Sequence, residues 1–224
     1  MDMPEKLNEG IDSWNTVMLL YHSALKEVGT KLEILNDEFQ HVHQYNPIEY
    51  IKSRIKTPES IVKKLRRNGY ESTIDNMVNY VNDIAGIRVI CSFVDDIYTV
   101  AEMLARQDDI NVLIVKDYIR CPKVNGYRSY HMIIEVPVFF SDRRENMRVE
   151  VQIRTIAMDF WASLEHKLCY KKDLPEELNR QLEHELFECA EISAALDLRM
   201  ERIKHRISDP CDPDIPKGND NEKK

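Results

Sequence analysis

Three polar residues alternate with apolar residues in the segment VEVQIRT at residues 149–155. Successive side chains of a β-strand point to opposite faces of a sheet, so we expect Glu150, Gln152 and Arg154 to share one face. The valine and isoleucine residues between them would then point into the packing. A carboxylate, an amide and a guanidinium on one strand face are unusual in a core. The spacing therefore predicts one wall of a polar site.

The segment KVNGYRSYH at residues 123–131 has the composition of a glycine-hinged loop that leads into a strand. Gly126 permits a backbone conformation that brings Asn125 and Tyr127 against a ligand. A tyrosine ring offers a stacking surface for a purine. Lys116 and Lys123 lie on either side of the connection that precedes this loop, and each carries a positive charge that can bind a phosphate. His131 begins the following strand, where a structural histidine and a site histidine fit the sequence equally well.

A group of cationic residues surrounds Ser60 at the start of a predicted helix. Its members are Arg54, Lys56, Lys63, Lys64, Arg66 and Arg67. Backbone N–H groups and the helix dipole at a helix N-terminus add to such side chains, and together they can hold a polyphosphate. Cations on a helix are also typical of a solvated face, so this group alone leaves both interpretations open.

Asp83 lies directly before a segment with the pattern of a buried strand, and Arg88 follows within that segment. An aspartate at a strand entrance is often only a turn or capping residue. A second carboxylate facing it would favour a metal site, because Mg²⁺ prefers oxygen and is commonly held by one or two carboxylates plus substrate phosphates. Glu150 is the candidate for that second carboxylate.

Helical and extended patterns alternate along the chain. Apolar residues at spacings of three and four predict helices over residues 11–44, 95–107, 156–170 and 175–207. Thr57 as N-cap, Pro58 at the first helical position and Gly69 as C-cap bound another helix. A short helix is expected around residues 72–80, after the segment 48–56 that leads into the capped helix.

Runs rich in β-branched residues predict strands over residues 85–93, 110–119, 130–139 and 147–154. The charged turn SDRREN at residues 141–146 joins the last two as an antiparallel hairpin. These elements predict an α/β (α+β) fold with a mixed sheet of about five strands, flanked by helices. The terminal helices exceed what one small sheet needs for cover, which favours a helix-mediated oligomer, although their apolar stripe would equally close a monomer core.

Composition limits the class of protein. The chain has 224 residues, a net charge of -8 and 43% hydrophobic residues, which is enough for one sizeable core. We expect a single domain over residues 1–208 and a disordered tail over residues 209–224. The acidic balance argues against generic nucleic-acid binding. The sequence shows no membrane span or signal peptide, and its five scattered cysteines are typical of reduced thiols, so we expect a cytoplasmic protein.

Four motifs occur together and in order: SRIK with Ser60 and Lys64 after it, DIAGIR, KVNGYRSYH and EVQIRT. In this combination residues 46–206 resemble the synthetase domain of the RelA/SpoT family, and specifically the small alarmone synthetases of the RelP and RelQ type. The resemblance implies a nucleotidyltransferase-like synthetase fold with a motif core over residues 46–170. It implies transfer of the pyrophosphoryl group of ATP to the ribose 3′-hydroxyl of GDP or GTP, giving (p)ppGpp and AMP in the stringent response. No segment resembles the hydrolase domain of the family, so we expect no hydrolysis.

The resemblance also implies roles for individual residues. Those expected to bind ATP are Arg54 and Arg88 at the adenine and Lys56, Ser60 and Lys64 at the phosphates. Those expected to bind GDP or GTP are Tyr127 at the guanine, Asn125, His131 and Gln152 in the acceptor pocket, and Lys116 and Lys123 at the 5′-phosphates. Asp83 and Glu150 are expected to hold Mg²⁺ and to be catalytic, with Glu150 placed to accept the 3′-hydroxyl proton.

One departure and two alternatives accompany this interpretation. Lys116 occupies a position where some relatives have arginine, and lysine lacks the bidentate fork of a guanidinium. The main alternative is a nucleotide-binding regulator that kept the fold and lost catalysis, although Asp83, Glu150 and Tyr127 are all present. A helical scaffold for RNA or protein is disfavoured by the net charge. The family suggests a homotetramer with the terminal helices as contacts.

Overall fold

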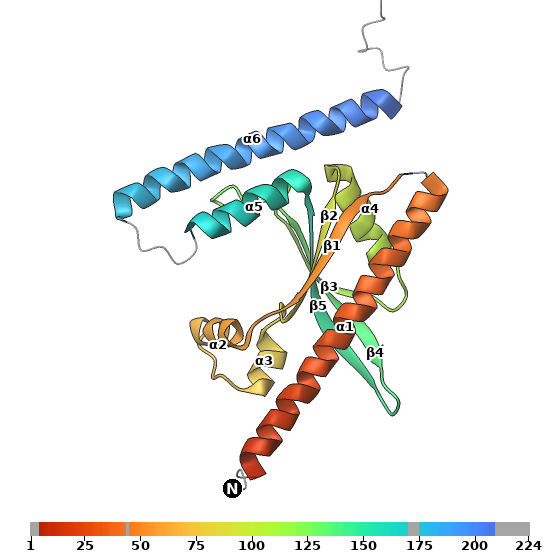
Figure 1. Cartoon of the computed structure of the whole chain (residues 1–224), viewed down its shortest axis with the longest axis vertical. Helices are drawn as coiled ribbons and strands as arrows, with labels where there is room; N and C mark the ends of the chain where they lie inside the picture. The colour runs from red at the N-terminus through yellow and green to blue at the C-terminus, as the bar shows by residue number, and fades with distance from the viewer. Residues whose placement is uncertain (1–4, 44, 170–174, 209–224) are drawn as a thin grey trace, which may run out of the picture.

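A mixed β-sheet forms the centre of the computed structural model, which describes residues 5–43, 45–169 and 175–208 (Figure 1). Within these residues the sheet has five strands in the order β1-β2-β5-β4-β3. The strands are β1 (Ile48–Ile55), β2 (Ala85–Cys91), β3 (Asn111–Asp117), β4 (Tyr130–Phe139) and β5 (Arg144–Thr155). Only the β2/β5 pair is parallel, and the other three pairs are antiparallel. The predicted fold class and the β4/β5 hairpin are confirmed.

Six helices accompany the sheet in the described residues. They are α1 (Glu5–His43), α2 (Pro58–Arg67), α3 (Ile74–Tyr80), α4 (Val94–Ala105), α5 (Ile156–Cys169) and α6 (Glu176–Ser208). The long helix α1 crosses one face of the sheet and contacts β1, β2, β4 and β5. α5 follows β5 directly and packs against α6, which lies outermost on that side (Figure 1).

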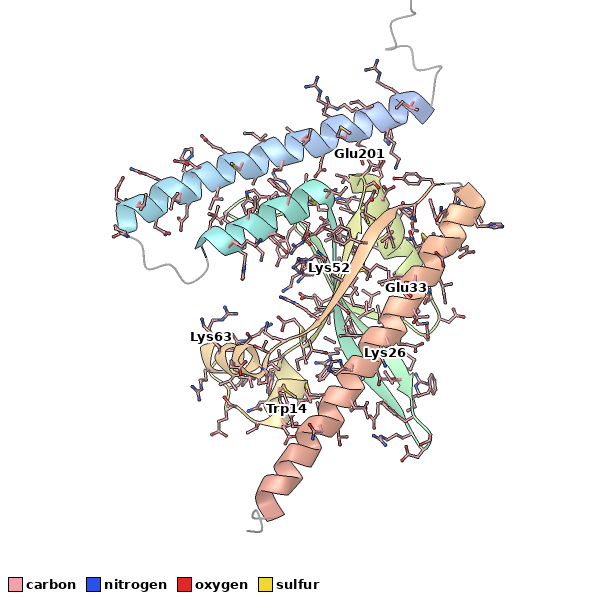
Figure 2. All side chains as sticks on the ribbon, in the orientation of Figure 1. Trp14, Lys26, Glu33, Lys52, Lys63 and Glu201 are labelled. Atoms are coloured by element: carbon pink, nitrogen blue, oxygen red, sulfur yellow. The ribbon has the colours of Figure 1, made fainter. Side chains whose placement is uncertain are left out.

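The main core lies between α1, α4 and one face of the sheet. The apolar stripe predicted on α1 supplies Tyr21, Val28 and Leu32, each at most 2% exposed. Side chains fill the space between this helix and the sheet, whereas Lys26 and Glu33 lie on its outer surface (Figure 2). Burial of this stripe is what stabilises so long a helix, because propensity alone contributes little.

The alternation predicted in β5 is confirmed. Val149, Val151 and Ile153 are fully buried in the main core. Glu150 and Gln152 point to the other face and are partly exposed. The parallel register places Glu150 beside Gly86 of β2 and Gln152 beside Arg88, so two strands contribute polar groups to the same face.

β1 was not predicted as a strand, and it supplies the fifth strand of the sheet. It lies at an edge, and most of its side chains are exposed, including Lys52 and Arg54. An edge strand with this little burial lacks the apolar alternation that identifies a strand in sequence.

The N-cap predicted for α2 is present, whereas the predicted C-cap, Gly69, is off by one residue. The Thr57 hydroxyl accepts a hydrogen bond from the Ser60 backbone N–H at 3.4 Å, and Pro58 begins the helix. The helix ends slightly earlier than predicted, with Asn68 as C-cap and Gly69 following at φ +81°. This glycine conformation is one that other residues rarely adopt.

The apolar stripe predicted on α6 does not close the core. Leu196, Met200, Ile203 and Ile207 are between 41% and 74% exposed. The two inward residues of this helix that are most buried are instead Ala190 and Asp197. The stripe therefore remains on the surface of the single chain.

Three remaining predictions concern the membrane, the thiols and the tail. No helix within the described residues combines the length and apolarity needed to cross a membrane. The thiols of Cys91, Cys121 and Cys189 are free, as predicted. The tail predicted at residues 209–224 lies outside the described residues.

Candidate active site

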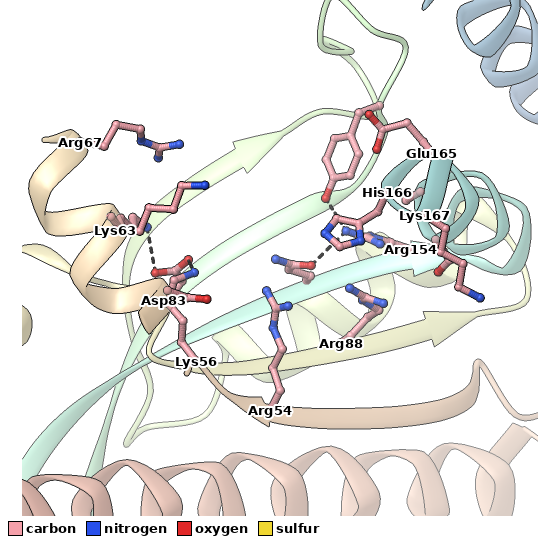
Figure 3. Close-up of a pocket in the computed structure, with 16 residues that line it drawn as sticks. Arg54, Lys56, Lys63, Arg67, Asp83, Arg88, Arg154, Glu165, His166 and Lys167 are labelled. Atoms are coloured by element: carbon pink, nitrogen blue, oxygen red, sulfur yellow. Dashed lines mark hydrogen bonds and ion pairs between the residues drawn. The ribbon is translucent and has the colours of Figure 1, made fainter. Parts of the chain in front are cut away.

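A polar cavity of about 670 Å³ lies on the sheet face opposite α1, between α2 and α5 (Figure 3). Three strands, α2 and the connections beside them contribute Arg54, Lys56, Ser60, Lys63, Lys64, Arg67, Asp83, Arg88, Tyr127, Gln152 and Arg154, and α5 contributes Ala162, Ser163, Glu165, His166 and Lys167. A smaller cavity of about 250 Å³ shares Arg54, Arg88 and Gln152 with it and reaches Glu150. Nucleotide-sized ligands fit cavities of this size and polarity.

Asp83 forms the centre of one end of the site. Lys56 from the end of β1 and Lys64 from α2 each donate to its carboxylate, at 2.9 and 2.8 Å. Burial alone would raise the pKa of Asp83, but the hydrogen bonds from Lys64 and Lys56 outweigh it and hold the pKa below its usual value. Two ammonium groups therefore surround one ionised carboxylate. We call these three side chains, Lys56, Lys64 and Asp83, the Asp83 end.

Glu150 lies at the other end of the site. Its carboxylate is 3.3 Å from His131 Nδ1 and accepts a hydrogen bond of 2.8 Å from Gln152 Nε2. Burial acts to raise the pKa of Glu150, and so does the negative charge of Asp83. The contacts with His131 and Gln152 outweigh both and hold the pKa of Glu150 below its usual value. Glu150 is thus ionised near neutral pH and within electrostatic reach of Asp83.

Tyr127 completes a closed ring of hydrogen bonds with Glu150. Its hydroxyl lies 2.9 Å from His131 Nε2 and also accepts from the Arg154 guanidinium. Arg154 in turn donates to Gln152 Oε1 at 3.0 Å, and Gln152 donates to Glu150. The five side chains, from β4, β5 and the 123–131 loop, hold one another in place. We call them the Glu150 ring.

The loop before β4 needs Gly126 for two reasons. Its φ of +83° lies in the left-handed region, and a Cβ at this position would come within 2.6 Å of the Ala190 Cβ atom on α6. Asn125 Oδ1 accepts from the backbone N–H of Tyr127 at 3.2 Å, which fixes the turn. The sequence prediction of a glycine hinge is confirmed, and the packing against α6 was not foreseen.

Lys123 lies against the aromatic rings of this loop. Its ammonium is 4.6 Å from the Tyr127 ring centroid and 4.7 Å from that of Tyr118. Burial and the nearby charge of Lys116 lower the pKa of Lys123. Two cations that repel each other in this way favour an anion between them.

The residues predicted from sequence fall into two groups. All five predicted for ATP line the larger cavity, together with Asp83, Tyr127 and Gln152. Glu150 lines the smaller cavity, and His131 joins it through the Glu150 ring. Lys116, Lys123 and Asn125 line neither cavity and lie at the edge formed by β3 and the loop.

Sequence reasoning missed the wall that α5 contributes. Ala162, Ser163, His166 and Lys167 recur at spacings of three and four, which places them on one side of a helix, and Glu165 lines the cavity beside them. That spacing was visible in the sequence, but charged residues at helical spacing are also typical of a solvated face. Arg154 was noted on the strand face but was not assigned to the site.

Within the described residues, no group of three or more His, Cys, Asp or Glu side chains is arranged to bind a metal ion. Asp83 and Glu150 are a pair of ionised carboxylates, each engaged by cationic or amide donors. Any metal here would need further oxygen ligands from outside the protein.

The family described as "Region found in RelA / SpoT proteins" matches residues 53–174, which span both ends of the site. The chain belongs to the RelA/SpoT family. GTP pyrophosphokinase YwaC from Bacillus subtilis is 48% identical over 203 residues, covering 91% of this chain and 96% of that protein. GTP pyrophosphokinase YjbM from the same organism is 35% identical over 198 residues, covering 88% of this chain and 90% of that protein.

Solved structures of family members share the fold. The small alarmone synthetase 2 of Bacillus subtilis superposes with a TM-score of 0.76 at 48% identity, covering 86% of this chain and 98% of that chain. The small alarmone synthetase 1 of the same organism, bound to its product pppGpp, superposes with a TM-score of 0.79 at 34% identity, covering 88% of this chain and all (100%) of that chain. The resemblance stated from four motifs is therefore confirmed along most of the chain.

Proposed function

We propose that this protein is a GTP pyrophosphokinase, which transfers the pyrophosphoryl group of ATP to the ribose 3′-hydroxyl of GDP or GTP. The observation that supports this most directly is the position of Asp83, its lysines, Tyr127 and Glu150 on one sheet face, around connected cavities. The similarity to relatives named GTP pyrophosphokinase over most of the chain supports the same activity.

The donor nucleotide would occupy the Asp83 end. Arg54 and Arg88 lie on neighbouring strands, and both line the two cavities, so their guanidinium planes can flank an adenine. Lys56, Ser60 and Lys64 would meet the phosphates beside the N-terminus of α2. Lys56 and Lys64, which form ion pairs with Asp83 in this structure, would then also bind phosphate oxygens of ATP.

The acceptor nucleotide would occupy the end formed by the Glu150 ring. Tyr127 would stack on the guanine, and Asn125, His131 and Gln152 would bound the pocket. Lys116 and Lys123, whose charges repel each other, would meet the 5′-phosphates at the outer edge. Glu150 would then face the ribose.

Glu150 would act as general base on the 3′-hydroxyl. Its carboxylate is ionised and is oriented by Gln152 and His131, so it can accept a proton without rearranging. The hydroxyl oxygen would then attack the β-phosphorus of ATP, and the bond from that phosphorus to the oxygen of the α-phosphate would break to release AMP. Positioning and charge neutralisation supply most of the catalysis in such transfers.

We propose Mg²⁺ as the cofactor. The donor set fits in kind, because Asp83 and Glu150 offer two ionised carboxylates with low pKa values and nucleotide phosphates would supply further oxygen ligands. When bound, the ion would neutralise phosphate charge. Lys56 and Lys64 share that task from the protein side.

Incubation of the purified protein with ATP, GDP or GTP and Mg²⁺, followed by ion-exchange chromatography, tests the activity. We expect AMP and a guanosine nucleotide with two added phosphates in equal amounts. Binding of both nucleotides with no new product would identify the inactive nucleotide-binding regulator instead.

We also propose a cytoplasmic homotetramer assembled through the terminal helices. The exposed apolar residues of α6, among them Leu196, Ile203 and Ile207, support an assembled state. Free thiols and the need for ATP and guanine nucleotides support the location. Light scattering of the purified protein gives the mass, and a monomer mass would remove the assembly proposal.

A further inference from the structure

One buried carboxylate on α5 contacts both halves of the site. Asp159 lies in the first turn of this helix and is 7% exposed. Its Oδ1 atom is 3.1 Å from Arg88 Nη1 and 3.2 Å from Arg154 Nη1. Its Oδ2 atom accepts a hydrogen bond of 3.2 Å from the Tyr50 hydroxyl on β1. A single carboxylate therefore joins three strands of the sheet at the site.

Positive charge exceeds negative charge around Asp159. Two guanidiniums share one carboxylate oxygen. Within the described residues, the other hydrogen-bond partners of Arg154 are the neutral side chains of Ser129, Tyr127 and Gln152. Burial and the charge of Arg154 lower the pKa of Arg88, whereas Asp159 opposes that shift. Asp159 is thus the anion that allows the buried Arg154 and the partly buried Arg88 to lie side by side.

The two arginines belong to different halves of the site. Arg88 lines both cavities and has been placed beside the adenine of the donor. Arg154 donates to the hydroxyl of Tyr127, the proposed platform for the guanine of the acceptor. A displacement of Arg88 therefore reaches the Tyr127 ring through only two further side chains.

We propose that Asp159 is a positioning residue that couples donor binding to acceptor binding through Arg88 and Arg154. A donor nucleotide that fixes the position of Arg88 also fixes the positions of Asp159, Arg154 and Tyr127. The acceptor then binds to a Tyr127 ring that is already in place. The effect is reciprocal, because any gain in acceptor affinity from the donor equals the gain in donor affinity from the acceptor. This inference rests on the nucleotide assignments in the proposed function.

Equilibrium binding measures the coupling directly. The Kd of GDP is determined by calorimetry in the absence and presence of a saturating, non-hydrolysable ATP analogue, with Mg²⁺ in both series. For the unaltered protein we expect the analogue to lower this Kd by roughly 5-fold or more, within the range common for coupled sites. We call the Kd of GDP without the analogue divided by the Kd with it the coupling ratio. For Asp159→Asn we expect a coupling ratio near one, with both nucleotides still binding.

Two further variants separate coupling from a general loss of structure. Asp197→Asn removes another buried carboxylate, one that contacts Thr155 at the end of β5 and lies outside both cavities. It should keep the full ratio. Tyr127→Phe keeps the ring for stacking but removes the hydroxyl that Arg154 contacts, so it should reduce the ratio as Asp159→Asn does. This second variant decides the question if Asp159→Asn does not fold.

The possible failures are distinguishable. A ratio of one in the unaltered protein, or an unchanged ratio in Asp159→Asn, would overturn the coupling. An unchanged ratio in Tyr127→Phe would do the same where Asp159→Asn is unfolded. Failure of the unaltered protein to bind either nucleotide would instead overturn the proposed function.

Discussion

The Asp83 end and the Glu150 ring each contain one ionised carboxylate, yet the two are held in different ways. Asp83 is held by ammonium groups from β1 and α2, two separate elements. Glu150 is held by side chains of neighbouring strands that also bind one another in a ring. The first arrangement is a cluster of charges on flexible stems, and the second is a framework of directed hydrogen bonds.

This difference matches what each end is proposed to bind. A polyphosphate is recognised mainly by its charge, which lysine ammonium groups satisfy in many geometries. A base and a ribose hydroxyl require fixed directions, which paired side chains on adjacent strands supply. Changes at the lysines of the Asp83 end should therefore alter ATP binding alone, and changes at the Glu150 ring should alter GDP binding and proton transfer.

Glu150→Gln should have the largest effect on turnover. The amide cannot accept the hydroxyl proton, so the rate should fall roughly 10² to 10⁴-fold, as is typical for loss of a general base. A thermal melt and GDP calorimetry should show a folded protein that still binds acceptor. Near-normal turnover would remove the general-base role and weaken the metal role.

Lys64→Ala should weaken the donor side alone. Loss of a charge-assisted contact to phosphate costs ~1.5–3 kcal/mol, so the KM for ATP should rise about tenfold or more. The Kd of GDP should stay constant. Arg66→Ala on the same helix is the matched control, because Arg66 does not line the larger cavity. Equal losses in the two variants would show that α2 supplies only a general cationic surface.

Tyr127→Ala should weaken the acceptor side alone. Removal of a base-stacking ring costs roughly 1–3 kcal/mol, so the Kd of GDP should rise by about 5-fold to 150-fold. Calorimetry with GDP, set against the ATP analogue measured alone, checks the result. A greater loss of ATP-analogue binding than of GDP binding would reverse the assignment of the two ends.

Gly126→Ala tests whether the loop depends on its close approach to α6. The left-handed backbone costs about 1–2 kcal/mol for a residue with a Cβ atom, and the new methyl group would meet Ala190. We expect a lower melting temperature and weaker GDP binding with unchanged ATP binding. A loop that tolerates alanine without either change would contradict this packing.

Asp197→Asn should give the smallest effect, and one that depends on pH. Burial raises the pKa of Asp197 to about 6, so the folded protein keeps a proton that the unfolded chain releases at lower pH. The stability from this group is complete below pH ~4 and is lost as the pH rises through about 6. The variant should therefore melt at a higher temperature than the unaltered protein at pH 8, and this gain should vanish near pH 4. A gain that is equal at both pH values would contradict the raised pKa.

The sequence predicted most of the residues at both ends of the site because chemistry and periodicity coincided there. Glu150 and Gln152 alternate with fully buried valines, and Gly126 is required where the structure has a left-handed turn. Thr57 and Pro58 likewise marked the start of α2 through local capping chemistry. Patterns set by neighbouring residues can be recognised without tertiary structure.

Other features depend on tertiary contacts and were not recognised. β1 is an exposed edge strand whose register with β2 places Arg54 beside Gly86, and its own sequence lacks clear alternation. The shared contacts of Asp159 with Arg88 and Arg154 join β2, β5 and α5. Side chains so distant in sequence meet only because of strand order, which local patterns do not specify.

The fate of the β-phosphate of ATP tests the central claim most directly. The protein is incubated with GDP, Mg²⁺ and ATP labelled at its β-phosphate, and the products are separated by chromatography. Pyrophosphoryl transfer predicts that all transferred label appears in the guanosine product, in equal amount to the AMP released. Label that remains in ADP, with a guanosine product that gained one phosphate, would contradict the proposed reaction.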